Sequence, residues 1–491
     1  MRIVFKTPVQ AFSKEALEML ELFYGNFEFY VNIDDRADII ALHEEKIENQ
    51  KRFLKVTLFC NSKAYESSSL KPTYSDIIIE KRMHKRQFKL CLYGCLVKAE
   101  NYKPPWGSLT GIRPTAMVYK RMREGESLKN SLDWFKNQFD VSEEKTELVR
   151  ETIIEQQKYA LPLKNAIDIY VGIPFCVSRC RYCSFFSGTA NNTALMEEYA
   201  DCLIKEISYV LPRIKNYNIR SFYMGGGTPT ALSLELLKKI LNALKPVLER
   251  TDEISVEAGR PDTIDKDKLK LFLDFGVNRI SVNPQTKHEK TLSIIGRSHT
   301  NKQTEEAFYL AKAMGFKNIN MDIIAGLPGE NENMFLETLN WIGNMAPESL
   351  TIHTLSIKRS SLMHQWKDTL PKNSVVESMV KAGREFCKEK DLKPYYLYRQ
   401  KRQAGNLENI GYAKYNKACI YNIDSMEEMC SIVALGAGGI SKAVNAGNDK
   451  IIRSANMMDA RRYIERIDKM LERKRKIISC LAPEEKGTLQ A

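Results

Sequence analysis

The chain lacks any hydrophobic run long enough to cross a membrane, and its first residues lack the apolar core of a signal peptide. These absences predict a cytoplasmic protein without a membrane partner. Eleven cysteines occur without a secretory signal, so we expect reduced thiols rather than a disulfide framework. The sequence contains no repeat and no low-complexity tract. A hydrophobic content of 43% over 491 residues indicates a folded protein with a substantial core.

Histidine is scarce, with six residues in the chain, and none lies near the densest group of cysteines. That group, Cys176, Cys180 and Cys183, has the spacing Cys-x3-Cys-x2-Cys and follows an apolar run. A structural zinc site needs a fourth ligand nearby, and the segment offers none. Three thiolates can instead hold three corners of a cubane iron–sulfur cluster, whereas an electron-transfer ferredoxin closes all four with cysteine. The spacing therefore predicts a 4Fe–4S cluster with an open iron that binds a small molecule.

From residue 165 onward, short β-rich segments alternate with amphipathic helical patterns. The predicted strands are 167–173, 221–227, 253–259, 279–285, 318–326 and 350–357. Predicted helices include 234–248 and 331–345, and Ser233 is a suitable N-cap for the first of these. Six strand–helix repeats predict a partial (β/α)6 TIM-like barrel, with its active-site face at the carboxyl ends of the strands.

The length of the chain predicts about three domains. Residues 1–160 read as an α+β domain without a metal or phosphate motif, 161–375 as the barrel, and 376–491 as a mainly helical domain that covers the substrate site. Cys91 and Cys95 in the first domain have no further ligands near them, so we interpret them as packed thiols.

Polar residues occur at or near the ends of several predicted strands, among them Glu257, Gln285, Arg297 and Asp322. Each alone fits an ordinary loop contact, but together they indicate a ring of ligand-binding groups at the barrel mouth. The segment GGGTPT at 225–230 allows a ligand to approach the backbone closely. It lacks the Gly-Lys-Ser/Thr ending of a nucleotide-binding P-loop.

The formal net charge of +13 fits either nucleic acid or an acidic small molecule as the ligand. Basic clusters at 81–86 and 473–476 lie outside the central segment, and we interpret them as solvated helix faces. The sequence does not favour nucleic acid as a partner.

These motifs resemble a known family. The cysteine spacing is similar to that of the radical S-adenosylmethionine superfamily, and residues 165–465 resemble its oxygen-independent coproporphyrinogen III oxidase family. The segments GGGTPT, GLPG (326–329) and LGAGGIS (435–441) support this resemblance. GRPDTI (259–264), YRQK (398–401), GNLENIGYA (405–413) and LTGIRPT (109–115) look most like its HemZ branch. By motif matching, the resemblance implies S-adenosylmethionine contacts at Tyr170, Tyr182, Gly226, Gly227, Thr228, Glu257, Gln285, Arg297, Asp322 and Ile440.

The resemblance also implies an activity. A reduced cluster would cleave bound S-adenosylmethionine to a 5′-deoxyadenosyl radical, which takes a hydrogen from the β-carbon of a substrate propionate. Loss of carbon dioxide and one electron would leave a vinyl group, and two rounds would convert coproporphyrinogen III to protoporphyrinogen IX in heme biosynthesis. The implied partners are a tetrapyrrole with propionate groups and a reducing protein such as flavodoxin or ferredoxin, with one or two S-adenosylmethionine molecules bound.

The sequence departs from the family at two positions. Gly172 stands where well-characterised oxidases have histidine, and Phe185 stands where a fourth, non-ligand cysteine follows their triplet. A related heme chaperone is an alternative, although the His-Asn…Tyr-Trp heme motif of those proteins is replaced at 405–410. A radical enzyme that degrades heme or modifies RNA is a further alternative.

Overall fold

The computed structural model describes residues 1–25, 27–33, 36–110, 113–159, 165–183, 188–190, 192–357, 361, 363, 370–400, 403–444 and 451–481. The chain forms two compact units, Met1–Arg150 and Glu151–Ala491. None of the helices among these residues is long and apolar enough to span a bilayer.

The first unit contains a five-stranded sheet with the order β2-β1-β3-β4-β5. Its strands are β1 (Arg2–Lys6), β2 (Glu28–Val31), β3 (Ile39–Glu48), β4 (Lys51–Cys60) and β5 (Lys63–Pro72). Strand β1 pairs in parallel with both of its neighbours, and β3, β4 and β5 pair in antiparallel fashion. Helices α1 (Ser13–Tyr24) and α2 (Ile77–Glu100) share a hydrophobic core with this sheet.

Cys91 and Cys95 lie on the buried face of α2, as predicted. Their thiols approach the carbonyl oxygens of Leu54 (3.8 Å) and Val56 (3.1 Å) in β4. Burial raises the pKa of Cys91 to about 11 and that of Cys95 to about 12, which keeps both protonated. The unit continues with α3 (Pro114–Arg123) and α4 (Leu128–Phe139), and α5 (Glu143–Gln156) leads into the second unit.

The second unit is built on an eleven-stranded sheet with the order β14-β15-β13-β12-β11-β10-β9-β6-β16-β17-β18. All six predicted barrel strands are present and parallel: β6 (Ala166–Ile173), β9 (Asn218–Gly226), β10 (Glu253–Gly259), β11 (Arg279–Val282), β12 (Ile319–Ala325) and β13 (Ser349–Thr354). The predicted partial barrel is therefore confirmed.

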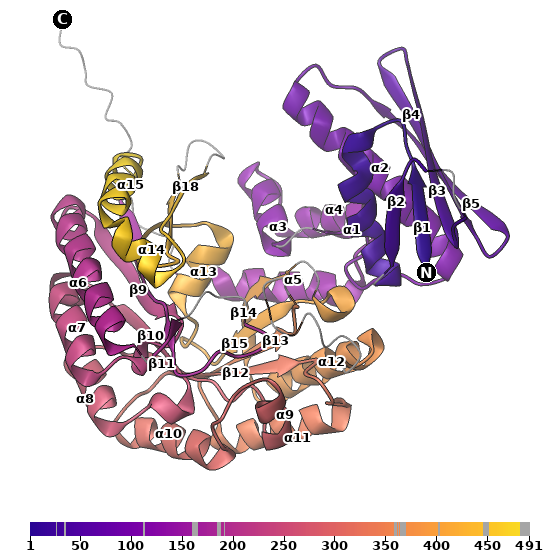
Figure 1. Ribbon diagram of the computed structural model, residues 1–491. Helices are drawn as coiled ribbons and strands as arrows, with labels where there is room; N and C mark the ends of the chain where they lie inside the picture. Colours follow the sequence, from indigo (N-terminus) through magenta and orange to yellow (C-terminus); the bar gives the residue numbers. More distant parts are fainter. Residues whose placement is uncertain are drawn as a thin grey trace, which may run out of the picture. The chain divides into compact units, whose positions relative to one another are not determined.

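Helices cover the outer face of the curved sheet (Figure 1). They are α6 (Thr193–Val210), α7 (Leu234–Leu248), α8 (Lys266–Asp274), α9 (Glu289–Ile294), α10 (Asn301–Ala313) and α11 (Glu332–Met345). The Ser233 hydroxyl caps α7 by accepting a hydrogen bond from the Leu236 amide at 3.3 Å, as predicted.

The C-terminal region extends the barrel sheet at both edges rather than forming a separate layer of helices. Strands β14 (Lys393–Tyr398) and β15 (Asn409–Ala413) add to β13, and β16 (Ser431–Gly436), β17 (Ile440–Val444) and β18 (Ile451–Ala455) add to β6. The helices of this region are α12 (Asn373–Glu389), α13 (Ile420–Glu427), α14 (Ala460–Glu465) and α15 (Ile467–Ser479). Because these strands pair with the barrel, residues 376–491 belong to the same compact unit.

Candidate functional site

The three cysteines lie on a loop that leaves the carboxyl end of β6. Cys176 ends the two-residue strand β7 (Phe175–Cys176), which pairs with β8 (Gly188–Thr189). The amide of Cys183 donates to the carbonyl of Cys180 at 3.1 Å, which closes a turn between the second and third thiols. Phe185, at the position of the family's fourth cysteine, lies outside the described residues.

The sulfur atoms of these cysteines suit a cluster better than a single ion. Among the described residues, the one trio of possible metal-binding side chains whose donor atoms all lie within 4.8 Å is Asp168, Asp424 and Cys430. The three loop cysteines do not converge so closely, and a single tetrahedral ion would require that they do. The Cys-x3-Cys-x2-Cys spacing is what predicts a cluster at these thiols.

The Asp168, Asp424 and Cys430 group lies away from this loop and has a simpler explanation than a metal. Burial raises the pKa of Asp168 well above its usual value and that of Asp424 to about 6, although Arg220 opposes the shift at both. Two carboxyls buried side by side favour sharing a proton over ionising together. Burial also raises the pKa of the Cys430 thiol, so it stays protonated.

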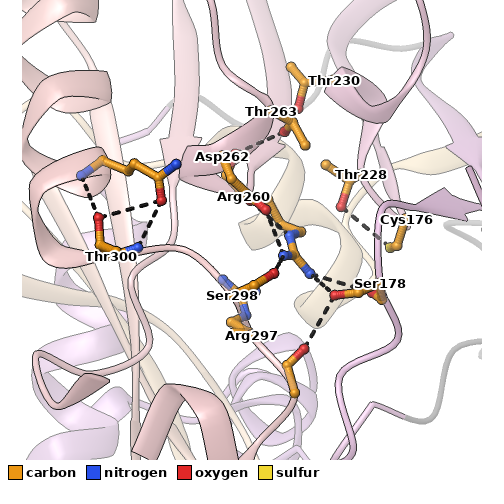
Figure 2. Close-up of polar contacts among 12 residues, drawn as sticks. Cys176, Ser178, Thr228, Thr230, Arg260, Asp262, Thr263, Arg297, Ser298 and Thr300 are labelled. Atoms are coloured by element: carbon orange, nitrogen blue, oxygen red, sulfur yellow. Dashed lines mark hydrogen bonds and ion pairs between the residues drawn. The ribbon is translucent and has the colours of Figure 1, made fainter. Parts of the chain in front are cut away.

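Arg260 fixes the cluster loop to the end of β10, as Figure 2 shows. Its fully buried guanidinium pairs with both carboxylate oxygens of Asp262, at 3.0 and 2.8 Å. The same group donates to the Ser178 hydroxyl at 2.6 Å, between the first and second cysteines. The sequence does not indicate that Arg260 holds the cysteine loop, because an Arg-Pro-Asp turn carries no signal of a contact 82 residues away.

A second attachment joins the loop to the segment after α9. The Arg181 amide donates to the Ile295 carbonyl at 2.9 Å, and the Ser178 hydroxyl donates to the Gly296 carbonyl at 3.3 Å. Arg297 follows in this segment and donates to the Asn283 carbonyl at 2.6 Å. Burial alone would lower the pKa of Arg297, but Tyr182 and Cys180 outweigh that effect and raise it, so the guanidinium is charged.

The glycine segment after β9 lies directly against the cluster loop. The amides of Gly227 and Thr228 donate to the carbonyls of Ile173 and Phe175, both at 2.7 Å. A Cβ at Gly227 would lie 2.5 Å from the Phe175 oxygen, so a side chain cannot be accommodated. The Thr228 hydroxyl lies 3.4 Å from the Cys176 sulfur. The segment thus forms a backbone-lined cradle beside the first cysteine, which fits the predicted cofactor.

Two carboxylates, Glu257 of β10 and Asp322 of β12, come from barrel strands on either side of β11. Glu257 accepts hydrogen bonds from the Tyr223 hydroxyl and, at 3.2 Å, from the Gly226 amide. Burial raises the pKa of Glu257 to about 7, although the tyrosine opposes the shift. Asp322 has the opposite shift: burial would raise its pKa, but His353, 3.6 Å away, and Asn320 lower it.

Gln285 is held in an unusual backbone conformation, with φ at 69°. Its amide donates to the Asp322 carbonyl at 2.9 Å, and its side-chain oxygen is buried without a hydrogen-bond partner. A strained residue with an unsatisfied buried acceptor is typical of a ligand site. Gln285 is therefore suited to accept a hydrogen bond from a hydroxyl of the cofactor, as the sequence predicts.

Tyr170 is part of a stack of three tyrosines in the barrel interior. Its ring lies 6.3 Å from that of Tyr223 and 6.0 Å from that of Tyr421, and the last two are 4.6 Å apart. Burial raises the pKa of Tyr170, so its hydroxyl stays protonated. Tyr421 belongs to α13, more than 200 residues after Tyr170 in the chain. No local sequence pattern indicates that these two rings meet.

Ile440 is placed differently from the other predicted cofactor contacts. It begins β17 with 49% of its surface exposed, and it does not line the cavity described below. The loop before Ile440 is connected to the site through Tyr199. The Tyr199 hydroxyl donates a hydrogen bond to the Gly172 carbonyl of β6 at 2.5 Å and accepts one from the Ala437 amide of that loop at 3.0 Å.

A cavity of about 240 Å³ opens beside the third cysteine. Its lining combines the cluster loop with side chains from β12, β13, β14 and β15: Tyr182, Cys183, Gln285, Ile324, His353, Thr354, Leu355, Ser356, Tyr398, Gln400 and Asn409. The position of the cavity, next to a cluster ligand and above the carboxyl ends of parallel strands, is that of an active site.

Comparisons with known proteins agree with this arrangement. A family model described as the radical SAM superfamily matches residues 170–342. The oxygen-independent coproporphyrinogen-III oxidase-like protein HemZ of Bacillus subtilis is 38% identical over 387 residues, which is 76% of this chain and 77% of that protein. The heme chaperone HemW of Buchnera aphidicola subsp. Acyrthosiphon pisum is 28% identical over 290 residues, or 59% of this chain and 73% of that one.

The solved structure of coproporphyrinogen III oxidase (HemN) from Escherichia coli, a radical SAM enzyme, has the same fold. It superposes with a TM-score of 0.51 at 19% identity and covers 68% of this chain and 74% of its own. The extent of the match to HemZ shows the family. The chain therefore belongs to the oxygen-independent coproporphyrinogen III oxidase-like family of the radical SAM superfamily.

Proposed function

We propose that this protein catalyses the oxygen-independent oxidative decarboxylation of coproporphyrinogen III to protoporphyrinogen IX. The observation that supports it best is the cavity between the cluster loop and the ends of β13, β14 and β15. This cavity brings Cys183 and the polar ends of the barrel strands to one hollow, where a substrate would lie beside a cluster-bound cofactor.

Membership in the superfamily implies a 4Fe–4S cluster and S-adenosylmethionine. Cys176, Cys180 and Cys183 would hold the cluster, which when bound supplies the electron that converts S-adenosylmethionine to methionine and a 5′-deoxyadenosyl radical. A reduced electron-transfer protein such as flavodoxin or ferredoxin would provide that electron.

The role proposed for the residues of this chain is to bind and orient the cofactor and the substrate. The 225–228 segment would offer backbone carbonyls to the amino group of S-adenosylmethionine, because the amides of Gly226, Gly227 and Thr228 already donate within the protein. Glu257, Gln285 and Asp322 would provide further acceptors around the cofactor. Tyr170, Tyr223 and Tyr421 close the barrel interior beneath the site with apolar surface, which excludes water. Exclusion of water protects a radical from side reactions.

The test is an anaerobic assay of the reconstituted protein with S-adenosylmethionine, a reductant and coproporphyrinogen III. We expect 5′-deoxyadenosine to form and the tetrapyrrole to lose two carboxyl groups, measured by mass spectrometry. If 5′-deoxyadenosine forms while the tetrapyrrole mass stays unchanged, the proposed substrate is wrong. Equilibrium dialysis of S-adenosylmethionine in the same preparation gives the number of molecules bound.

A heme chaperone is the second candidate, because relatives 28% identical to this chain have that name. The purified protein would then retain heme at one molecule per chain without cleaving S-adenosylmethionine in its presence. The segment 405–410 lacks the histidine of the chaperone motif, and Asn409 stands in the cavity wall instead. These differences favour the enzyme.

A further inference from the structure

Three hydrogen-bond donors face the active-site cavity from adjacent strands. His353 follows Ile352 of β13, which pairs with Ile410 of β15, and Tyr398 of β14 pairs with Asn409 of β15. His353, Tyr398 and Asn409 all line the cavity. They therefore form a row across three adjacent strands in the cavity wall.

The amide of Asn409 has a fixed orientation. Its side-chain oxygen accepts a hydrogen bond from the Thr354 amide at 2.8 Å, so its side-chain nitrogen must point the other way. That nitrogen is buried without a partner, and the whole residue is only 1% exposed. A buried donor left unsatisfied is costly unless a ligand supplies an acceptor.

The other two members of the row can also donate. Burial raises the pKa of Tyr398 to about 12, with Asp322 and Glu257 adding to the shift and Gln400 opposing it, so the phenol keeps its proton. The imidazole of His353, whose Nε2 atom lies 3.6 Å from an Asp322 oxygen, carries an N–H donor in either tautomer. His353 is the one described residue lining the cavity that can take a positive charge, and no carboxylate is among them.

We propose that His353, Tyr398 and Asn409 form a carboxylate-binding subsite that holds a propionate group of the substrate. This inference rests on the proposed function and adds the residues that recognise the acidic end of the molecule. A carboxylate has two oxygens that accept several hydrogen bonds, so it matches a row of a phenol, an amide and an imidazole N–H. None of the three was identified from the sequence as a site residue.

The test compares two ligands that differ only in their carboxylates. Reconstituted protein is dialysed anaerobically against coproporphyrin III, a stable relative of the substrate, or against its tetramethyl ester, and bound porphyrin is measured by fluorescence after extraction. Asn409→Asp keeps the oxygen that holds the Thr354 amide but replaces the cavity-facing donor with a repelling oxygen. We expect the free acid to bind about tenfold more weakly or worse, with the ester unaffected.

Asn406→Asp is the matched control, because it makes the same change three residues away at a position that does not line the cavity. We expect it to bind both ligands like the unchanged protein. His353→Gln, which removes the imidazole, should weaken binding of the free acid selectively in the same way. It serves as the second variant if Asn409→Asp loses its cluster or its cooperative thermal unfolding.

The outcomes separate the inference from the function on which it rests. Equal binding of the free acid by Asn409→Asp, His353→Gln and the unchanged protein would overturn the subsite and leave the proposed function standing. Equal weakening of acid and ester would also overturn it, because the variants would then have damaged the cavity as a whole. If the unchanged protein binds neither porphyrin, the proposed function falls and the subsite falls with it.

Discussion

The ammonium group of Lys474 lies 3.4 Å from a carboxylate oxygen of Glu206, and both side chains are fully buried. The other Glu206 oxygen accepts hydrogen bonds from the Gly436 amide at 2.7 Å and the Tyr463 hydroxyl at 2.6 Å. This pair therefore joins α15 and α6 to the glycine-rich loop that lies against β6. The pair thereby helps α15 to hold this loop against β6, the strand that leads into the cysteine loop.

Removing one member of this pair should destabilise the protein strongly. We expect Lys474→Met to lower the free energy of unfolding by about 3–5 kcal/mol, because Glu206 would be left buried without its counter-ion. Chemical denaturation followed by circular dichroism measures the change. Lys476→Met is the control, since Lys476 is 69% exposed and forms a surface pair with Glu472. Equal stability of the two variants would contradict the importance of the buried pair.

The cluster assignment is tested by single cysteine substitutions. Cys180→Ala should abolish the visible absorbance of the reconstituted protein and reduce its iron and sulfide content, because the open cubane would lose one of three protein ligands. Cys202→Ala, in α6, is the control and should keep a full cluster. An intact cluster in Cys180→Ala would show that this thiol is not a ligand.

Binding of S-adenosylmethionine should depend on pH through Glu257. The pKa of Glu257 is about 7 in the folded protein, raised from 4.5. Between these two pH values the folded state holds more protons than the unfolded state, so the stability of the fold decreases as pH rises. If the cofactor contacts the ionised carboxylate, its affinity should be about tenfold weaker at one pH unit below this pKa than well above it. Calorimetric titration measures the profile.

Glu257→Gln provides the control for that profile. The amide keeps the size of the side chain but does not titrate, so we expect a weaker affinity that no longer changes with pH across the same range. Cluster absorbance should be measured at each pH to exclude loss of iron. A variant that keeps the pH dependence of the unchanged protein would assign it to another group.

Gly172 should not tolerate a side chain. A Cβ at this position would lie 2.4 Å from the Ala437 carbonyl oxygen, and one at Gly436 would lie 2.4 Å from the Gly172 oxygen. We expect Gly172→Ala to cost about 1–3 kcal/mol of stability through the forced separation of β6 from the loop after β16. Thermal unfolding measures it.

Gly188→Ala is the matched control, because a Cβ there meets its nearest neighbour, Phe175, at an ordinary 3.6 Å. It should unfold at the temperature of the unchanged protein. If Gly172→Ala does the same, the close approach of the two backbones is not a constraint on this chain.

The barrel and the cluster ligands could be predicted because their signals are local. Each barrel strand is a short β-rich segment, and each helix has apolar residues at helical spacing, so the order of elements follows from periodicity alone. The cysteines lie within eight residues of one another, and their spacing defines the ligand set without knowledge of the fold. The structure confirms all six strands and places the glycine segment beside the cluster loop.

Features that depend on distant segments could not be predicted. The basic run 473–476 was interpreted as a solvated helix face, and this was wrong for Lys474, which is fully buried against Glu206, 268 positions earlier in the chain. The C-terminal region is predicted to be a separate domain, yet β15 and β16 pair with the barrel edge strands β13 and β6, and β14, β17 and β18 extend the sheet beyond them. Burial and strand pairing of this kind leave no periodic signal in the local sequence.

The sequence by itself predicts a cluster held by three thiolates, since their spacing is a local pattern. The tertiary structure alone decided what faces that cluster. His353, Tyr398 and Asn409 come together because β14 and β15 return to pair in antiparallel fashion with the last barrel strand. Arg260 reaches the cluster loop only because parallel strands end at the same edge of the sheet. Local spacing specifies ligands, whereas a substrate-binding wall is specified by which strands become neighbours.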